Sequence, residues 1–401
     1  MNSREKTIIR ELAKEYMQFA CSEKQQKAEQ RMKAGNDLKI VRPTVLMDEI
    51  PWWELTGEEE LICQCEDPKA RGVETYLRRA LYQKRHFCCD VLMKPYWCVT
   101  MKVDVSPLGI EEKEEENTAL AHHYEDVLED ESALDLIMDP VFELRPDVDE
   151  ANMNYYQELL GEAMPVRLMG HGYLYSAPWD DISFLRGVEP IYEDMYDRPE
   201  YLHQIMQKFV DRTTAKLDFI EAHSHVSSDP VELHCTPGSI SGLAEDGWKA
   251  TWYRGMAQPF TCISPAMFKE FELDYIKPVA ERFAYTYYGC CEALDDRIAL
   301  IKTISNLRKI GVSPWANVEV CAEQIGKDYV FARKPNPSHV AKNTDPEVVR
   351  KETEESVKAC LKYGCPGEFV LKDITTISGD PKNLVIWAKT VSDVMDKYYG
   401  E

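Results

Sequence analysis

Residues 284–312 read AYTYYGCCEALDDRIALIKTISNLRKIGV and contain one complete strand–helix–strand unit. The first segment, Ala284–Tyr288, is short, aromatic and apolar, which is typical of a buried strand. Asp296–Ile304 has the apolar spacing of a helix, and Leu307–Val312 is a second short apolar run. Two strands that are joined by a helix run parallel, so this stretch predicts a parallel α/β fold.

The same alternation continues on both sides of this unit, from about residue 165 to the C-terminus. Six successive strand–helix units close most simply into a (β/α)8 TIM barrel, whose missing strands we expect between Val41 and Val105. An open doubly wound sheet is the main competitor, but it normally carries a Gly-rich phosphate turn, and no GxGxxG or GxxxxGK[ST] occurs. The further predicted strands and helices are Pro165–Met169, the helix opened by Asp197, Val231–His234, the helix capped by Ser264 with Pro265, Val318–Ile325, Tyr329–Ala332, Thr344–Gly364, Phe369–Lys372 and Pro381–Tyr398.

We therefore expect a barrel over residues 41–401, preceded by an N-terminal helical extension over residues 1–40. In the extension, Ile8, Ile9, Leu12, Tyr16 and Met17 fall on one helical face.

Composition excludes several classes of protein. The 401 residues carry a formal net charge of −23, which argues against a nucleic-acid partner because phosphate binding needs clustered Lys and Arg. No apolar run approaches the ~20 residues of a membrane span, and the charged N-terminus lacks the apolar centre of a signal peptide. We expect a cytoplasmic protein in which the 13 cysteines are reduced rather than paired in disulfides.

Polar residues follow the predicted strands. In a parallel barrel these positions converge on one face, which is where catalysis takes place. We predict that this face carries substrate-binding residues and a catalytic group. The predicted substrate-binding residues are His171, Tyr173, Tyr288, Trp315, Arg333 and Asn336, and the predicted catalytic residues are His234, Glu292 and Asp373.

His234, Cys290 and Glu292 are the candidate metal ligands. An imidazole, a thiolate and a carboxylate suit Zn²⁺, and three protein ligands leave a fourth position for substrate. Such an ion acts as a Lewis acid on a substrate oxygen or sulfur. The alternative is that Cys290 and Cys291 are buried core residues, that Glu292 is at the surface, and that His234 is satisfied by backbone.

Two further motifs are open to two interpretations. Arg333-Lys334-Pro-Asn336-Pro is a rigid basic turn that suits a phosphate or carboxylate, or else a stiff loop with solvated charges. Asp180-Asp181 is an acid–base pair or the N-terminal cap of a helix.

Several stretches resemble the uroporphyrinogen decarboxylase superfamily, within it the branch of corrinoid-dependent methyltransferases. The resemblance runs from about residue 50 to the end of the chain. It rests on Cys65-Glu-Asp-Pro, Phe184-Leu-Arg-Gly-Val-Glu-Pro, Tyr288-Gly-Cys-Cys-Glu, Ser313-Pro-Trp, Tyr329-Val-Phe-Ala-Arg-Lys-Pro-Asn-Pro and Phe369-Val-Leu-Lys-Asp-Ile-Thr-Thr.

The resemblance implies a (β/α)8 barrel and a methyltransferase of the EC 2.1.1 type, assisted by zinc. Such an enzyme moves a methyl group from a small donor, for example a methoxylated aromatic, to Co(I) of a separate corrinoid protein. His234 or Glu292 would then serve as a general acid for the leaving group. A homodimer is left open.

This chain departs from the zinc methyltransferases of that superfamily, which use a His-x-Cys pair and a later Cys. The matching strand end reads Tyr287-Tyr288-Gly-Cys290-Cys291, and Lys372-Asp373-Ile-Thr375 stands where the third ligand would fall. The ligand set therefore differs or zinc is absent, and a non-catalytic barrel is one alternative. A decarboxylase is a second alternative, although its RQAGRY motif is missing.

Overall fold

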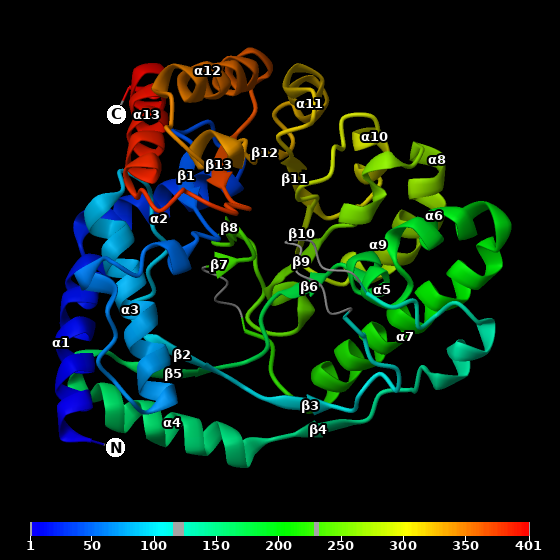
Figure 1. The fold of residues 1–401 in the computed structure, drawn as a ribbon, viewed down its shortest axis with the longest axis horizontal. Helices are drawn as coiled ribbons and strands as arrows, with labels where there is room; N and C mark the ends of the chain where they lie inside the picture. The colour runs from blue at the N-terminus through cyan, green and yellow to red at the C-terminus, as the bar shows by residue number, and fades with distance from the viewer. Residues whose placement is uncertain (1, 115–123, 228–231, 401) are drawn as a thin grey trace.

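A computed structural model describes residues 2–114, 124–227 and 232–400. Its centre is a seven-stranded sheet in the order β1-β13-β12-β11-β10-β9-β6, in which every pairing is parallel (Figure 1). The sheet curves as a half barrel, so the α/β class and the parallel arrangement are confirmed. Its strands are β1 (Thr44–Met47), β6 (Leu174–Ser176), β9 (Trp252–Gly255), β10 (Tyr285–Tyr288), β11 (Leu307–Val312), β12 (Val330–Arg333) and β13 (Gly367–Leu371).

The barrel is not fully closed, which corrects one part of the prediction. The remaining described strands form separate pairs: β2 (Trp97–Thr100) with β5 (Val166–Met169), β3 (Val103–Val105) with β4 (Phe142–Leu144), and β7 (Glu232–Leu233) with β8 (Thr236–Pro237). Because β1 and β6 each pair on one side only, the main sheet has two open edges.

Two strand predictions were wrong in their role. The predicted strand Val231–His234 begins outside the described residues, and its remainder forms the antiparallel β7–β8 hairpin instead of a barrel strand. The barrel strand is β9, which sequence reasoning missed because Arg254 interrupts its apolar run. The predicted strand Pro165–Met169 exists as β5 but pairs with β2 outside the main sheet.

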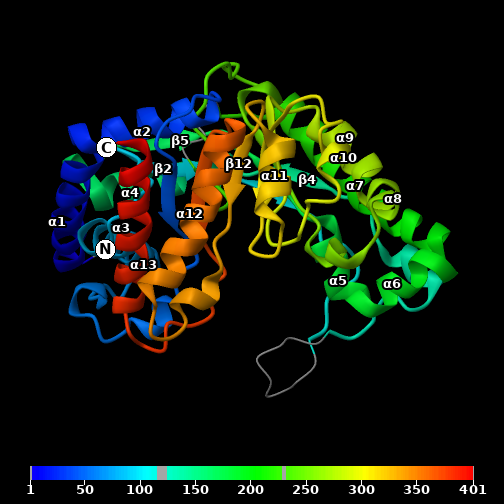
Figure 2. The ribbon, with the colours of Figure 1, turned by 90° about the horizontal axis from the view of Figure 1, so that it is seen from above.

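Helices surround the sheet. Figure 2 shows α11, α12 and α13 together beside the strands of the C-terminal half, with both chain termini on that side of the molecule. The helices are α1 (Ser3–Ala20), α2 (Glu23–Asn36), α3 (Pro68–His86), α4 (Pro146–Leu160), α5 (Pro178–Arg186), α6 (Val188–Asp197), α7 (Pro199–His223), α8 (Pro265–Phe268), α9 (Asp274–Ala280), α10 (Ile298–Ile301), α11 (Val318–Ile325), α12 (Pro346–Tyr363) and α13 (Lys382–Tyr399).

Local chemistry explains where these helices begin and end. The Ser264 side chain accepts a hydrogen bond from the Met267 N–H at the start of α8, and Pro265 occupies the first turn, as predicted. Gly364 ends α12 in the left-handed conformation, which is also the predicted C-terminus. Helices α1 and α2 lie within residues 1–40, and α1 packs against α3 and α4. Whether this extension is a separate unit stays a prediction.

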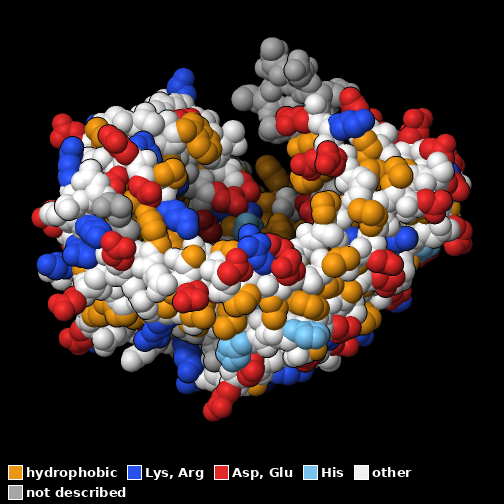
Figure 3. All heavy atoms as spheres, turned by 90° about the horizontal axis from the view of Figure 1, so that it is seen from below, with side chains coloured by type: hydrophobic (Ala, Val, Ile, Leu, Met, Phe, Trp, Pro, Cys, Tyr) orange, Lys and Arg blue, Asp and Glu red, His pale blue; other side chains and the backbone are white. Residues whose placement is uncertain are grey.

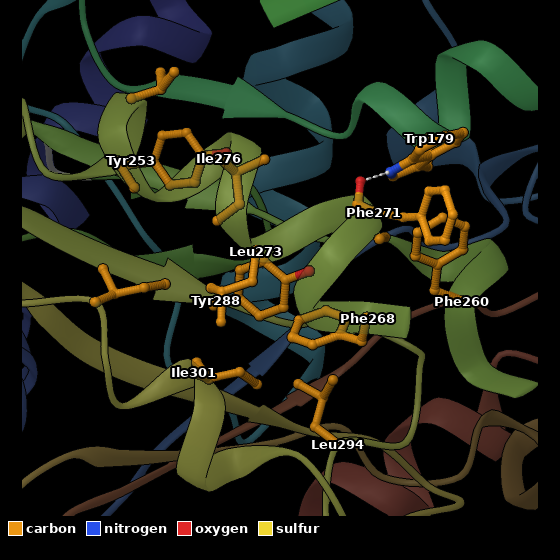
Figure 4. Packing of buried hydrophobic residues seen from close by; sticks show 14 of the residues in the cluster. Trp179, Tyr253, Phe260, Phe268, Phe271, Leu273, Ile276, Tyr288, Leu294 and Ile301 are labelled. Atoms are coloured by element: carbon orange, nitrogen blue, oxygen red, sulfur yellow. Dashed lines mark hydrogen bonds between the residues drawn. The ribbon is translucent and has the colours of Figure 1, made fainter. Parts of the chain in front are cut away.

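Strand alternation divides the interior into two layers. On β10, Tyr288 faces outward into the largest apolar cluster, with Phe268 and Ile276 from the covering helices (Figure 4). Tyr287 faces inward, where it packs with Trp252 from β9. No helix in the described part of the chain is long and apolar enough to cross a membrane.

Candidate active site at the mouth of the half barrel

The carboxyl ends of the parallel strands meet the β7–β8 hairpin at one mouth. The surface is hollowed there, between the two halves of the molecule (Figure 3). Three non-glycine residues at this mouth have positive φ: Glu49 after β1 (+50°), Cys235 in the hairpin (+55°) and Asp373 after β13 (+57°). Non-glycine residues rarely adopt this conformation, and such strain collects at functional sites.

Glu49, His234 and Cys235 form a candidate metal-binding group. One ligand atom from each lies within 4.8 Å of the other two, and within the described ranges no other set of three meets this condition. The Cys235 thiol lies 3.7 Å from Glu49 Oε1 and 3.4 Å from His234 Nε2. A carboxylate, an imidazole and a thiol are the donors that zinc accepts.

Two buried cations hold the hairpin residues in place. Arg254 Nε donates to the His234 carbonyl oxygen at 3.4 Å, and Lys334 Nζ donates to the Cys235 carbonyl oxygen at 3.0 Å. Both cations lie over the Tyr287 ring, with the Arg254 guanidinium 3.8 Å from its centre. Arg254 and Lys334 therefore hold the backbone of His234 and Cys235 in the β7–β8 hairpin against the sheet.

Cys290 lies buried beside this group, and its surroundings favour the thiolate form. The hydrogen bond from the Cys291 thiol, at 3.6 Å, is the main reason that the pKa of Cys290 lies well below its usual range, and His234 and Arg254 act in the same direction. Lys372 Nζ also donates to Cys290 Sγ at 3.0 Å. Cys291 in turn lies 2.7 Å from an Asp373 carboxylate oxygen, and its own pKa is raised.

The structure brings only part of the predicted ligand trio together. His234 lies near enough to Cys290 to contribute to the lowered pKa of its thiol. Glu292 instead accepts a hydrogen bond from the Cys290 backbone N–H at 2.9 Å, and its burial raises the pKa of its carboxyl group. Because the three ligand atoms do not gather within 4.8 Å, Glu49 and Cys235 take the places beside His234 that we predicted for Cys290 and Glu292. Glu292 is also 2% exposed rather than at the surface.

Asp180 is a titratable group on the α5 side of the mouth. It lies in the first turn of α5 and accepts a hydrogen bond from the Gln258 N–H at 3.3 Å. Burial, together with the negative charges of Glu292 and Cys290, raises the pKa of Asp180 to about 7. Asp180 can therefore exchange a proton near neutral pH.

Several predicted substrate-binding residues have structural partners instead. Tyr288 is fully buried and donates its hydroxyl proton to Glu272 at 3.0 Å. Arg333 pairs with Glu352 of α12 at 2.9 Å, and the Asn336 side chain caps the short helix Pro337–Val340. Tyr288 and Arg333 point away from the mouth because alternate positions of a strand face opposite layers. Asn336 does so because its side chain caps the short helix that follows in its own loop.

The other predicted residues differ in how accessible they are: the His171 imidazole Nε2 is buried and has no hydrogen-bond partner in the described part of the chain. Trp315 is 69% exposed after β11, and Tyr173 lines a cavity together with Glu232. His171 follows β5, where its backbone N–H donates to the His225 carbonyl oxygen and burial lowers the pKa of its imidazole. Their roles in substrate binding stay predictions.

Sequence reasoning missed Glu49, Lys372 and Arg254 as parts of the site. Arg254 carried a usable signal, because a cation inside the aromatic run Trp252-Tyr-Arg-Gly is unusual unless it has a buried partner. Glu49 carried no such signal in the sequence. Its place in the site depends on its positive φ and on the β7–β8 hairpin, which lies far along the chain.

The arrangement defines an α/β half barrel with a thiolate and a candidate metal-ligand set at its mouth. No family model matches the sequence, and no curated protein matches it. Among solved structures, the chain is similar to a methyltransferase from Methanosarcina mazei. The two are 12% identical, the match covers 93% of this chain and 99% of that chain, and the TM-score is 0.50. At this identity the likeness shows a shared fold.

Proposed function

We propose that the protein is a methyltransferase that moves a methyl group from a small donor to Co(I) of a separate corrinoid protein. The observation that carries this proposal is the Glu49–His234–Cys235 group at an open mouth, beside the Cys290 thiolate. The shared fold with a protein named a methyltransferase agrees with the proposal, although a fold alone does not set the chemistry.

The residues at the mouth fit a zinc ion. Their donor atoms are one nitrogen, one sulfur and one oxygen, and three protein ligands leave a fourth position open to substrate. Bound there, zinc would supply a Lewis acid to the donor atom that loses its methyl group. We place the ion on Glu49, His234 and Cys235.

The surrounding side chains suit the charge changes of such a reaction. When Co(I) takes the methyl group, the donor oxygen or sulfur keeps the bonding electron pair and becomes more negative. The Lys372 ammonium lies at the mouth, 3.6 Å from Glu49 Oε1, where it stabilises negative charge. Asp180 holds a proton near neutral pH and is a candidate donor to an oxygen leaving group.

We expect the corrinoid partner to dock at the mouth, where the methyl donor would be held. The exposed Trp315 and the half-exposed Tyr175 lie on loops and strands that end at the mouth, where they are available to a docking protein.

The direct test mixes the zinc-loaded protein with a reduced corrinoid protein and candidate methyl donors, while cobalt absorbance is followed. We expect conversion of Co(I) to methyl-Co(III) with at least one donor, and a rate that is lower by about a hundredfold or more in His234→Ala. Absence of methylcobalt with methoxylated aromatics, methylamines and methyl thioethers would remove the proposal.

A further inference from the structure

A cavity of about 360 Å³ lies at the open edge of the sheet, next to the mouth. One wall is a face of α3 that includes Tyr76 and Arg79, and the other is formed by the end of β1 and by the β7–β8 hairpin. Figure 1 shows this hairpin inside the ring of elements, with β1 and α3 to its left. The volume is in the range of small-molecule sites.

The inner wall of this cavity carries two carboxylates, Asp48 and Glu232. Within the described residues, no cation forms an ion pair with either carboxylate. Glu232 is exposed, and it lines both this cavity and a neighbouring one of about 140 Å³, which Lys94 also lines.

Aromatic side chains line the same space. Trp52 and Tyr76 both face the cavity. Arg79, the cation of the outer wall, lies over the Trp52 ring at 5.1 Å, so its guanidinium is already placed against an aromatic face. Asp90 also lines the cavity but is ion-paired with Arg31, so among the described residues two carboxylates, Asp48 and Glu232, stand against the single lining cation Arg79. This net negative charge and the aromatic rings favour a positively charged ligand with an apolar body.

We propose that this cavity binds a small organic ammonium cation with an aromatic or aliphatic body. Asp48 immediately precedes Glu49, and Glu232 lies two residues before His234, so the cavity adjoins the two segments that carry the candidate metal group, although none of that group's three side chains lines it. The inference rests on the proposed function in one respect: it assigns the methyl donor to the class of organic cations rather than to neutral or anionic methoxylated aromatics.

The transfer balances for a cation that carries a methyl ether. The C–O bond breaks, its electron pair stays on oxygen, and the carbon forms a bond with the electron pair of Co(I). The ammonium group takes no part in bond making. It serves to hold the donor, and no oxidant or further reductant is consumed.

Three probes that share one body test the charge preference: 2-(4-methoxyphenyl)ethylammonium, 2-(4-methoxyphenyl)ethanol and 3-(4-methoxyphenyl)propanoate. Calorimetric titration without any corrinoid protein should give the cation at least tenfold tighter binding than the alcohol, and the carboxylate the weakest. Glu232→Gln should reduce the preference for the cation over the alcohol to less than threefold. The matched control Glu347→Gln, at an exposed position in the first turn of α12, should retain the preference for the cation over the alcohol. Thermal unfolding checks that each variant is folded, and Asp48→Asn serves as a second variant.

Tighter binding of the carboxylate, equal binding of all three probes, or a preference that survives in both Glu232→Gln and Asp48→Asn would overturn the inference. Because binding is measured without cobalt, the two proposals fail separately. Selective cation binding without methyl transfer would contradict the proposed function alone, and methyl transfer without cation selectivity would contradict this inference alone.

Discussion

At the residue scale, Asp180 is held where its charged form is disfavoured. Its pKa in the fold is about 7, against an ordinary value of 3.8, so the folded protein binds more protons than the unfolded chain between these two values. Stability from this group is therefore fully present below about pH 4 and falls as the pH rises through 7. Neutralising the side chain should remove that penalty.

We predict that Asp180→Asn stabilises the fold at pH 8 by about 2 kcal/mol and changes it little at pH 4. The check is urea denaturation of both proteins at the two pH values. Equal destabilisation at both would mean that the Gln258 contact, rather than the charge, determines the effect of this residue.

Single residues also set the limit of sequence reasoning at the site. Residue types with useful chemistry, such as His234 and Cys290, could be selected from the sequence because they follow predicted strands. The backbone conformations of Glu49, Cys235 and Asp373 were not, because a positive φ at a non-glycine residue leaves no mark in the sequence. The candidate metal group depends on these conformations; it contains His234, which the sequence singled out, and does not contain Cys290 or Glu292.

At the scale of elements, the inward face of the sheet carries a buried ion pair. Lys309 on β11 donates to Glu368 Oε2 on β13 at 2.8 Å, and also to Thr236 and the Pro237 carbonyl oxygen in the hairpin. Burial lowers the pKa of Lys309 to about 8, although the Glu368 charge opposes this. This contact connects the hairpin to the strands beneath it.

Lys309→Met leaves the Glu368 carboxylate buried without its cation, and we predict a loss of about 3–5 kcal/mol in the free energy of unfolding. The Lys309→Met/Glu368→Leu double variant should recover most of this loss, since replacing a whole buried pair is often neutral. Chemical denaturation of the three variants forms the test. A double variant no more stable than the single one would show that the hydrogen bonds to the hairpin matter more than the charges.

A close approach of two glycines shapes the neighbouring strand ends. A Cβ on Gly311 of β11 would lie 2.7 Å from the Gly289 carbonyl group and 3.1 Å from the Cys290 nitrogen. Only glycine fits at this distance, so the Cys290 loop depends on the strand beside it.

We predict that Gly311→Ala destabilises the protein by about 1–3 kcal/mol. Gly57→Ala, where nothing lies within 4 Å of the added carbon, is the control and should behave as wild type. Thermal and chemical unfolding of the two variants and of wild type measure this effect. Unchanged stability in Gly311→Ala would contradict the packing described here.

Elements with clear periodicity were predictable. Leu307–Val312 and Val318–Ile325 have the bounds that their apolar patterns indicate, and α12 ends at the predicted glycine. The strand β9 was not, because inward-facing cations such as Arg254 give a barrel interior a polar pattern that mimics a loop. Short strands with charged inward positions are therefore the least predictable part of this fold.

At the scale of the whole molecule, the sheet stays open between β1 and β6. The sequence predicted the strands β10, β11, β12 and β13 of the main sheet, but it missed β6 and β9 and could not indicate which early strands pair with the sheet. That depends on contacts across the chain, such as β2 with β5. The open edge matters for function because the cavity beside α3 and the β7–β8 hairpin both lie there.

The central claim is that two segments far apart in the chain, ending at Glu49 and His234–Cys235, meet to bind one metal ion. Glu49 and Cys235 are 186 residues apart, yet the Cys235 thiol and the Glu49 carboxylate lie 3.7 Å apart. Only the complete fold creates this group.

Zinc binding by purified wild-type protein, Glu49→Gln, His234→Ala and Glu292→Gln, measured with a competing chelator and checked by elemental analysis, tests this claim most directly. We predict one zinc per chain in wild type, an affinity at least about tenfold lower in Glu49→Gln and in His234→Ala, and an unchanged affinity in Glu292→Gln. Zinc retained by both Glu49→Gln and His234→Ala, or lost only in Glu292→Gln, would contradict it.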